Sequence, residues 1–202
     1  VQMVECRIMK ATGRWLAMMV LALSPLAHGA GFDDTLAKAK SGDAVAQMEV
    51  ADAYAKGLGV EKNPKDAVEW YKKAAEQGNA DAQVALGNLL IGGKGVPKDS
   101  VEAAKWFLAA AEQGKPAAQL QVARMHLTGL GVPRSQVDAC MWAKLAAEKG
   151  DKNAKQFLTF LTPKMTEQQI AEADELVGDY KKNKPGDDAA KGVPLVAPPL
   201  EQ

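Results

Sequence analysis

His126 and Cys140 are the residues of this sequence best suited to chemistry, because a histidine can activate a cysteine as a nucleophile and both types bind zinc. Catalysis by Cys140 would need a base held beside its thiol. A metal site would need two or more His, Cys, Asp or Glu side chains that converge, and no such spacing is present. We therefore predict no catalytic residue, no metal and no cofactor.

The acidic residues follow a pattern that helix formation explains without chemistry. Asp66, Glu102 and Asp138 recur in the first turns of predicted helices, where free backbone amides favour negative charge. Glu76 and Glu112 recur in the last turns of the same helices, where they face water. No unexplained acidic pair is left to act as general acid and base. The sequence therefore predicts that the protein is not an enzyme.

Three glycine-rich segments could be mistaken for phosphate-binding loops. They read GLGV at 57–60, GKGVP at 93–97 and GLGVP at 129–133. A phosphate-binding loop follows a strand, opens a helix and carries Lys-Ser/Thr or a third Gly at fixed spacing. These segments instead follow predicted helices and end in Val or Val-Pro. We interpret them as turns between helices.

The elements that contain these residues repeat with a period of 36 residues. The pentapeptide AAEQG occurs at 74–78 and at 110–114, and AAEKG follows at 146–150. A fixed period of this length is typical of a solenoid, in which each unit buries its apolar face against its neighbours. The glycines and tryptophans that define the repeat are Gly57, Gly59, Trp70, Gly78, Gly93, Gly95, Trp106, Gly114, Gly129, Gly131, Trp142 and Gly150.

Each unit is predicted to contain two helices. The first helices are Asp43–Lys56, Ala80–Ile91 and Pro116–Thr128. The second helices begin after the cap residues Asn63, Asp99 and Ser135, show an apolar stripe of helical spacing, and end at a glycine. In the last turn, AAEQG, the alanines allow close packing and we expect Glu and Gln to face water. The predicted fold is an all-α, right-handed α-solenoid of antiparallel helix pairs.

The repeat pattern resembles the Sel-one-like repeat, a relative of the tetratricopeptide repeat, from residue 42 to about 150. The resemblance rests on Ala46-Gln47, Trp70-Tyr71, the GxGV turns and the AAEQG segment, with their copies. Two positions depart from it, since His126 takes the place of Tyr54 and Ala143 the place of Tyr71. These are changes of volume that leave the fold intact. We expect three full repeats, with Asp33–Lys40 as an N-terminal capping helix and 153–161 and 166–180 as the C-terminal cap.

The resemblance implies a protein that binds another protein or a peptide, because the first helices of the related superhelix line its concave side. Two rows of residues on those helices are candidates for this surface. They are Asp52, Asn88, Arg124 and Phe160 in one row, and Met48, Val84, Leu120 and Gln156 in the other. The second row is equally well explained as core between helices. The charged and polar members of the first row are harder to bury without partners.

The two ends of the chain predict export and a tail. Lys10 and Arg14, the apolar run 15–27 and small residues near Gly29 have the order of a secretory signal peptide, cleaved near Gly29/Ala30. The apolar run is too short to span a bilayer, so we expect no stable membrane anchor after cleavage. Met9 would make a natural translation start in place of Val1. We expect residues 30–183 to form the repeat domain and the proline-rich 184–202 to be disordered.

The predicted function is therefore a periplasmic or secreted scaffold in the bacterial envelope, with an adaptor or regulatory role. A formal net charge of zero and the absence of basic runs argue against nucleic-acid binding. Two alternatives stay open. Some cysteine-rich exported relatives are linked to penicillin binding or hydrolysis, although Cys140 would be the single cysteine of the mature chain. The repeats could also form a structural spacer without one specific partner.

Overall fold

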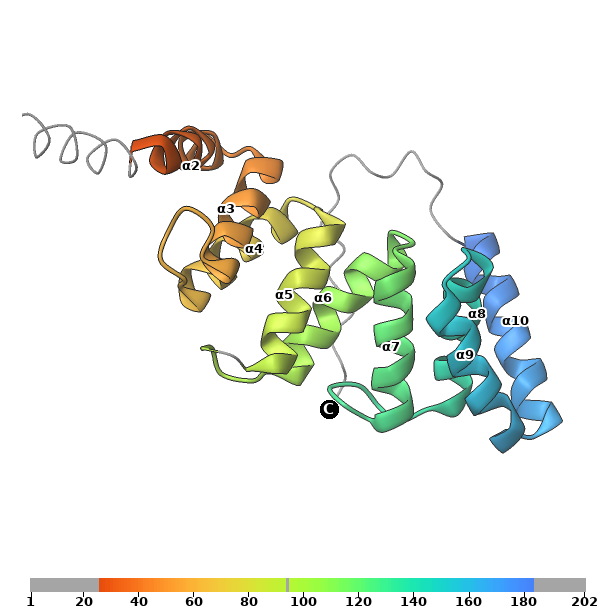
Figure 1. Ribbon diagram of the computed structural model, residues 1–202. Coiled ribbons are helices and arrows are strands. Elements are labelled where there is room, and N and C mark those ends of the chain that lie inside the picture. Colours follow the sequence, from red (N-terminus) through yellow and green to blue (C-terminus); the bar gives the residue numbers. More distant parts are fainter. Residues whose placement is uncertain (1–25, 94, 184–202) are drawn as a thin grey trace, which may run out of the picture.

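The computed structural model of the protein describes residues 26–93 and 95–183, which form an all-α solenoid without any strand (Figure 1). The helices of this part of the chain are α2 (Leu26–Lys40), α3 (Ala44–Lys56), α4 (Pro64–Glu76), α5 (Ala80–Gly92), α6 (Ser100–Glu112), α7 (Pro116–Thr128), α8 (Gln136–Glu148), α9 (Lys152–Leu161) and α10 (Glu167–Asn183), with a 3-10 turn at Thr162–Lys164. The predicted helix pairs are confirmed.

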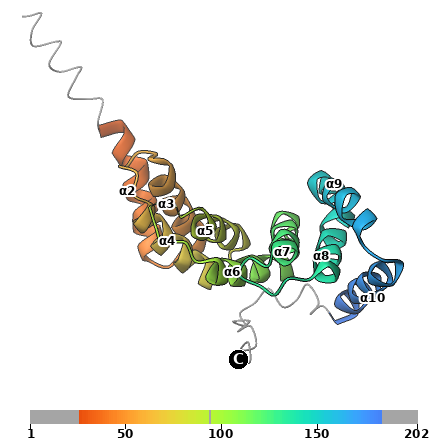
Figure 2. The ribbon, with the colours of Figure 1, turned by 90° about the horizontal axis from the view of Figure 1, so that it is seen from below.

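The helices form two rows that follow a common arc. Each helix from α3 to α7 packs mainly against the helix before it and the helix after it in the chain, and α8 contacts α7, α9 and α10. Viewed from below, α3, α5, α7 and α9 lie on the inner side of the arc, and α4, α6 and α8 lie on the outer side (Figure 2). We call these helices the inner row and the outer row. The first helix of each unit thus lines the concave side.

The helix boundaries are set by local signals that the sequence displays. The side chains of Asn63, Asp99 and Ser135 accept hydrogen bonds from backbone amides in the first turns of α4, α6 and α8. At the other end, Gly78 and Gly114 follow the C-caps with φ of +86° and +85°. Glycine adopts this left-handed conformation without a steric penalty, so each chain reversal occurs at the same place in the repeat.

The core combines fully buried alanines with larger side chains, such as Leu86 and Phe107 in the second unit. Ala67, Ala103 and Ala139 are fully buried and occupy the same position in successive outer helices. One core position varies in size between units, because Tyr71 and Phe107 occupy the position that Ala143 holds in the third unit. Phe107 has room because residue 87, opposite it on α5, is a glycine. Small residues therefore allow close contact between helices, and a large side chain in one helix is matched by a small residue in the helix opposite.

The C-terminal helix does not pair with α9 as the second helix of a fourth unit would. Its start matches the predicted capping box, since the amide of Thr166 donates to Gln169 Oε1 and the amide of Gln169 donates to Thr166 Oγ1. However, α10 packs mainly on α8. The ring of Tyr180 lies 5.3 Å from that of Trp142 in an edge-to-face arrangement. The cap therefore covers the third tryptophan of the repeat.

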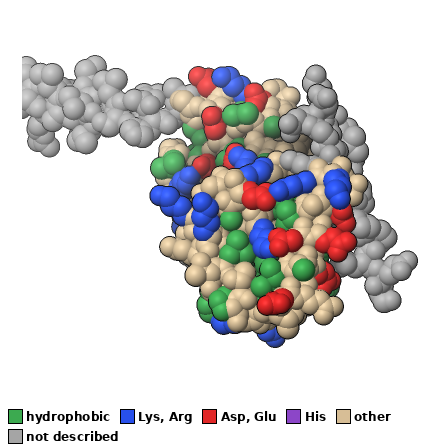
Figure 3. All heavy atoms as spheres, turned by 90° about the vertical axis from the view of Figure 1, so that its right-hand side faces the viewer, with side chains coloured by type: hydrophobic (Ala, Val, Ile, Leu, Met, Phe, Trp, Pro, Cys, Tyr) green, Lys and Arg blue, Asp and Glu red, His purple; other side chains and the backbone are tan. Residues whose placement is uncertain are grey.

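This end of the solenoid presents a mixed surface to water. Figure 3 faces the C-terminal end and shows small groups of hydrophobic side chains separated by acidic and basic ones. Ion pairs hold α10 in place, with Lys144 Nζ 2.5 Å from Asp174 Oδ1 and Lys181 Nζ 2.6 Å from Glu148 Oε2. Such a surface suits the last unit of the described solenoid, because an end unit exposes one of its faces to water.

The N-terminal cap is longer than the predicted Asp33–Lys40, because α2 begins at Leu26. Phe32 and Leu36 pack against a small core of Ala39, Ala46 and Val50. Among the described residues, no helix has both the length and the apolar character needed to cross a membrane. The tail predicted at 184–202 and most of the predicted signal peptide lie outside the described residues.

A ladder of buried glutamines connects successive units. Gln47, Gln83 and Gln119 repeat every 36 residues and are the buried polar residues of the described chain. Their Nε2 groups donate to the carbonyls of Ala39, Ala75 and Ala111, each at 3.1 Å. Each acceptor lies near the end of the preceding helix. A buried amide costs free energy unless it is paired, so these bonds favour one register between helices.

The glutamine of AAEQG is exposed at Gln77 and Gln113, as predicted, and its side chain also takes part in this ladder. Gln77 Nε2 donates to Gln47 Oε1 at 2.7 Å, and Gln113 Nε2 donates to Gln83 Oε1 at 2.8 Å. In the third unit Lys149 replaces this glutamine and donates instead to the carbonyl of Gly114. The Oε1 atom of Gln119 is consequently buried without a donor among the described residues.

Exchanging glutamine and lysine at the equivalent positions 113 and 149 tests the ladder. Lys149→Gln should raise the free energy of unfolding by about 1 kcal/mol, because the new amide can donate to Gln119 Oε1. Gln113→Lys should lower it by a similar amount by leaving Gln83 Oε1 unpaired. Urea denaturation followed by far-ultraviolet circular dichroism measures both. Equal stability of the two variants would contradict the proposed pairing.

Candidate protein-binding surface

The predicted binding residues Asp52, Asn88, Arg124 and Phe160 all lie on helices of the inner row. The first of them, Asp52, is already hydrogen-bonded to other side chains of the protein. The Asp52 carboxylate accepts hydrogen bonds from the Tyr71 phenol and from Lys56 Nζ, which lies 2.5 Å away. Its side chain is 33% exposed. Partial desolvation raises the pKa of Asp52, but the hydrogen bonds from Lys56 and Tyr71 outweigh it, so the net pKa is lowered. The pKa of Tyr71 is raised, mainly by burial of the phenol and secondly by its hydrogen bond to the Asp52 carboxylate and the negative charge of that group.

Asp52→Asn should change the stability at both ends of the pH range. A lowered carboxylate pKa contributes stability above about pH 4, and this contribution is lost as pH falls through the folded-state pKa. The variant should therefore be less stable than wild type by about 1 kcal/mol at neutral pH, with the difference shrinking in acid. At alkaline pH, the pKa of Tyr71 should be lower in the variant, because the carboxylate no longer opposes ionisation of the phenol.

Two titrations check this expectation. Denaturation at a series of pH values gives the stability difference, and ultraviolet absorbance of phenolate gives the tyrosine titration. Tyr71→Phe identifies the contribution of Tyr71 to that curve. An unchanged tyrosine titration in Asp52→Asn would show that the two side chains are not coupled.

The next two members of this set, Asn88 and Arg124, are exposed and are joined by a residue that the sequence did not single out. Gln121 Nε2 donates to Asn88 Oδ1 at 3.5 Å, and Arg124 Nη1 donates to Gln121 Oε1 at 3.2 Å. The three side chains thus link α5 to α7 across the inner row. Gln121 could have been found from its position one helical turn before Arg124. All of their partners here are neutral amides.

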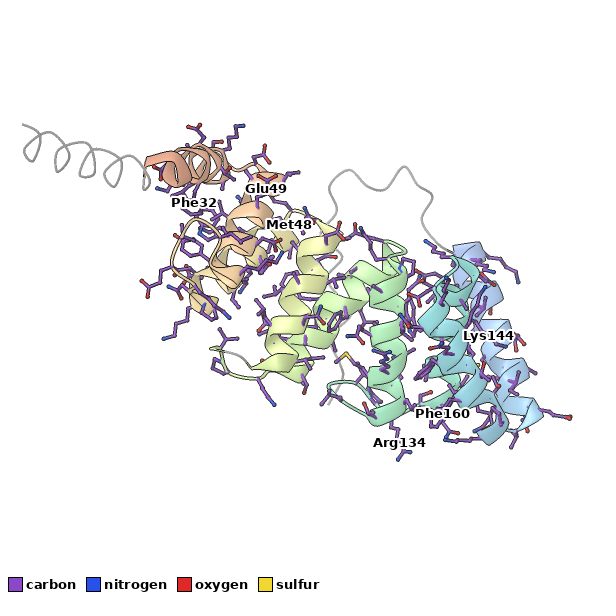
Figure 4. The ribbon with its side chains drawn as sticks, viewed as in Figure 1. Phe32, Met48, Glu49, Arg134, Lys144 and Phe160 are labelled. Atoms are coloured by element: carbon purple, nitrogen blue, oxygen red, sulfur yellow. The ribbon has the colours of Figure 1, made fainter. Side chains whose placement is uncertain are left out.

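The remaining predicted residues divide between surface and core. Phe160 is 57% exposed, and Lys164 Nζ lies 3.2 Å from the centre of its ring. Leu120 is only 4% exposed and packs with Ala146 and Ala154, so it belongs to the core. Met48 and Val84 are partly buried against the same core that contains the outer helices. Figure 4 labels Met48 and Phe160 at the two ends of the inner row.

The side chain of His126 contacts the turn before α8, and the thiol of Cys140 lies in the core. His126 Nδ1 lies 3.1 Å from the carbonyl oxygen of Pro133 and 3.9 Å from Asp138 Oδ2, so the ring links α7 to the turn before α8. Cys140 is buried, and burial raises the pKa of its thiol, which disfavours the reactive thiolate. Within the described ranges, no group of three or more His, Cys, Asp or Glu residues could hold a metal ion.

The formal charge of the inner row changes sign along the solenoid. Glu49 and Asp52 exceed Lys56 on α3, and Asp81 is the charged residue of α5, so each helix carries −1. With His126 neutral, α7 carries +1 from Arg124. The helix α9 carries +2 from its two lysines, Lys152 and Lys155, and contains no carboxylate. The row is therefore acidic at its N-terminal half and basic at its C-terminal half.

The cations of the inner row also differ in their partners. Lys56 pairs with Asp52, and Lys115, before α7, pairs with Asp81 at 2.8 Å. Arg124, in contrast, has no carboxylate of the described residues within the 4.0 Å limit of an ion pair. An exposed guanidinium with amide partners keeps its capacity to bind a carboxylate in a bidentate manner.

These features define an all-α solenoid repeat protein, and comparisons with known proteins agree. The Sel1 repeat family matches three consecutive segments, 44–79, 80–115 and 116–151, which together make up more than half of the chain. This protein therefore belongs to the Sel1 repeat family. Proteins of this family generally mediate protein–protein interaction and are typically scaffolds rather than enzymes.

Solved structures show the same repeat architecture. A Sel1 repeat protein from Oxalobacter formigenes is 38% identical, with a TM-score of 0.58 over 62% of this chain and 95% of the other. The protective antigen c5321 of uropathogenic Escherichia coli is 31% identical, with a TM-score of 0.50 over 76% of this chain. This chain covers only 41% of that antigen.

A more distant likeness concerns the fold alone. The cysteine-rich protein B of Helicobacter pylori is 19% identical, with a TM-score of 0.52 over 63% of this chain and 95% of the other. A comparison with curated proteins gives no match.

Proposed function

We propose that this protein is an exported adaptor that binds another protein or a peptide along its inner row. The observation that carries the proposal is the exposed polar bridge of Asn88, Gln121 and Arg124, which joins α5 and α7, two neighbouring helices of the inner row. A rigid surface formed in advance needs little reorganisation to bind, which favours affinity from a modest area. Family membership supports a role in protein interaction.

Affinity capture from the envelope fraction of the source cells tests this function. The full chain is compared with a variant carrying Asn88→Ala, Arg124→Ala and Phe160→Ala, which removes three exposed inner side chains. Asp52 is left unchanged because it holds Tyr71 and Lys56. The matched control carries Glu69→Ala, Lys72→Ala and Lys105→Ala, which are exposed residues of the outer row. Circular dichroism checks that all three proteins are equally helical.

A partner retained by wild type and by the outer-row control, but lost by the inner-row variant, would support the proposal. Equal retention by all three proteins would place binding elsewhere and reject the inner row. Capture by none of them would favour the spacer alternative.

Export is supported by the signal-peptide pattern of residues 10–30. Cleavage near Ala30 would leave Phe32 and Leu36 in place, and these are the side chains with which α2 packs on α3. Cell fractionation with N-terminal sequencing of the protein tests this part of the proposal. A protein found in the envelope fraction and beginning near Ala30 is expected, whereas an uncleaved protein in the cytoplasm would reject export.

A further inference from the structure

We propose that Gln121, Arg124 and Phe160 of the inner row, together with Lys164 of the 3-10 turn after α9, form a surface that binds an acidic peptide segment with an apolar side chain. We call this surface the basic half. The inference rests on the proposed function and specifies the chemistry of the partner. It follows from the distribution of charge along the row, from the lack of a carboxylate beside Arg124, and from the exposure of Phe160.

Charge complementarity selects an acidic partner. Lys56 on α3 and Lys115 at the start of α7 are already neutralised, because they pair with Asp52 and Asp81. Glu49 is exposed on α3 and adds negative charge there, which would repel an acidic segment. In the basic half, Arg124 faces only the amide oxygen of Gln121. A carboxylate that approaches α7 and α9 would therefore gain an ion pair without displacing an existing one.

Phe160 provides the apolar part of the surface. It takes the position on α9 that Arg124 takes on α7, one repeat earlier. Its ring is more than half exposed, and Lys164 covers it from one side at 3.2 Å. A bound segment could therefore place an aliphatic or aromatic side chain against the open part of the ring, with carboxylates toward Arg124 and Lys164. A cation beside an exposed aromatic ring, as Lys164 is beside Phe160, favours this combination over a purely acidic or a purely apolar segment.

Selection from a random-peptide display library on the full-length protein tests the proposal. Peptides are counter-selected on Arg124→Glu, and the enriched sequences are read. We expect a clear excess of Asp and Glu over Lys and Arg, with at least one Phe, Tyr, Trp, Leu, Ile or Met in most sequences. Enrichment of basic or uncharged peptides, or no enrichment over the counter-selecting variant, would overturn the proposal.

Matched variants locate the site by fluorescence anisotropy with an enriched acidic peptide. Arg124→Glu should weaken binding about tenfold or more, because like charges then face each other. Arg134→Glu makes the same change of charge in the exposed turn before α8 and should leave binding within about twofold. Phe160→Ser should weaken binding, whereas Leu130→Ser, at an exposed leucine of the same turn, should not. Equal effects of the two arginine variants would overturn the proposal.

The test separates this inference from the proposed function. If a cellular partner is lost by the inner-row variant but the selected peptides are not acidic, the basic-half inference fails and the binding function stands. If neither peptides nor a cellular partner depend on the inner row, both fail. A peptide with Glu replaced by Lys that binds Arg124→Glu better than wild type would confirm direct charge pairing.

Discussion

Gly131→Ala should lower the free energy of unfolding by about 3 kcal/mol or more. A Cβ atom at this position would lie 2.0 Å from the carbonyl oxygen of Ser100 and 2.5 Å from its carbonyl carbon. Both atoms belong to the backbone at the start of α6, so neither can rotate away. The substitution should therefore push the turn 129–133 away from the repeat 80–115, which contains Ser100. It should also strain the backbone of residue 131, whose φ is +74°.

Gly129→Ala is the matched control, because Gly129 has almost the same backbone conformation, with φ of +75°. Its Cβ would meet nothing closer than the Arg134 Cβ, at 3.3 Å. It should cost only the left-handed strain of about 1 kcal/mol. Urea denaturation gives both values, and hydrogen exchange shows whether α7 and α8 lose protection first. Equal losses in the two variants would mean that the close approach to Ser100 does not contribute.

Gly87→Ala should cost about 2 kcal/mol, because it inserts a methyl group into a filled core. The new Cβ would lie 2.8 Å from two carbons of the Phe107 ring, which is itself fully buried. Thermal and urea denaturation measure the loss. Adding Phe107→Leu to Gly87→Ala should recover part of it, because the smaller side chain vacates the volume that the methyl group needs.

Gly92→Ala is the control for this second substitution. Gly92 ends the same helix, α5, and a Cβ at this position would have no neighbour within 4 Å. Because alanine is the better helix former, this change should be neutral or stabilising by about 0.5 kcal/mol. A Gly87→Ala protein as stable as the Gly92→Ala protein would show that α5 and α6 are packed more loosely than the geometry indicates.

These glycines illustrate what a repeated sequence can and cannot reveal. The 36-residue period marked Gly131 as part of the repeat. The reason that a glycine is needed there lies in another unit, where the backbone at Ser100 leaves no room for a side chain. Gly87 is not part of the period, since Ala51 and Ala123 occupy the same position elsewhere. A glycine is needed at position 87 because the Phe107 ring lies opposite it, and only the packing of α5 on α6 brings the two residues together.

The candidate surface was predicted in part. Periodicity placed Asp52, Asn88, Arg124 and Phe160 at one position of the inner helices, and the exposure of the last three agrees with that. The pattern could not distinguish Leu120, which is buried, from the exposed members, because a helix facing both solvent and core has apolar residues near its boundary. It also could not show that Asp52 is held by Tyr71 from the neighbouring helix. Whether this surface binds a partner stays a prediction.

The sequence by itself determined the helix pairs, their caps and the left-handed glycines, because each depends on residues within a few positions of one another or on exact repetition. Only the tertiary structure decided the glutamine ladder, in which Gln77 contacts Gln47, and the position of α10, whose Tyr180 reaches the carbonyl of Glu112. These contacts join residues 30 and 68 positions apart. The physical reason is that buried polar groups and a terminal helix take partners according to the space that the packed units leave, and local sequence does not encode that space.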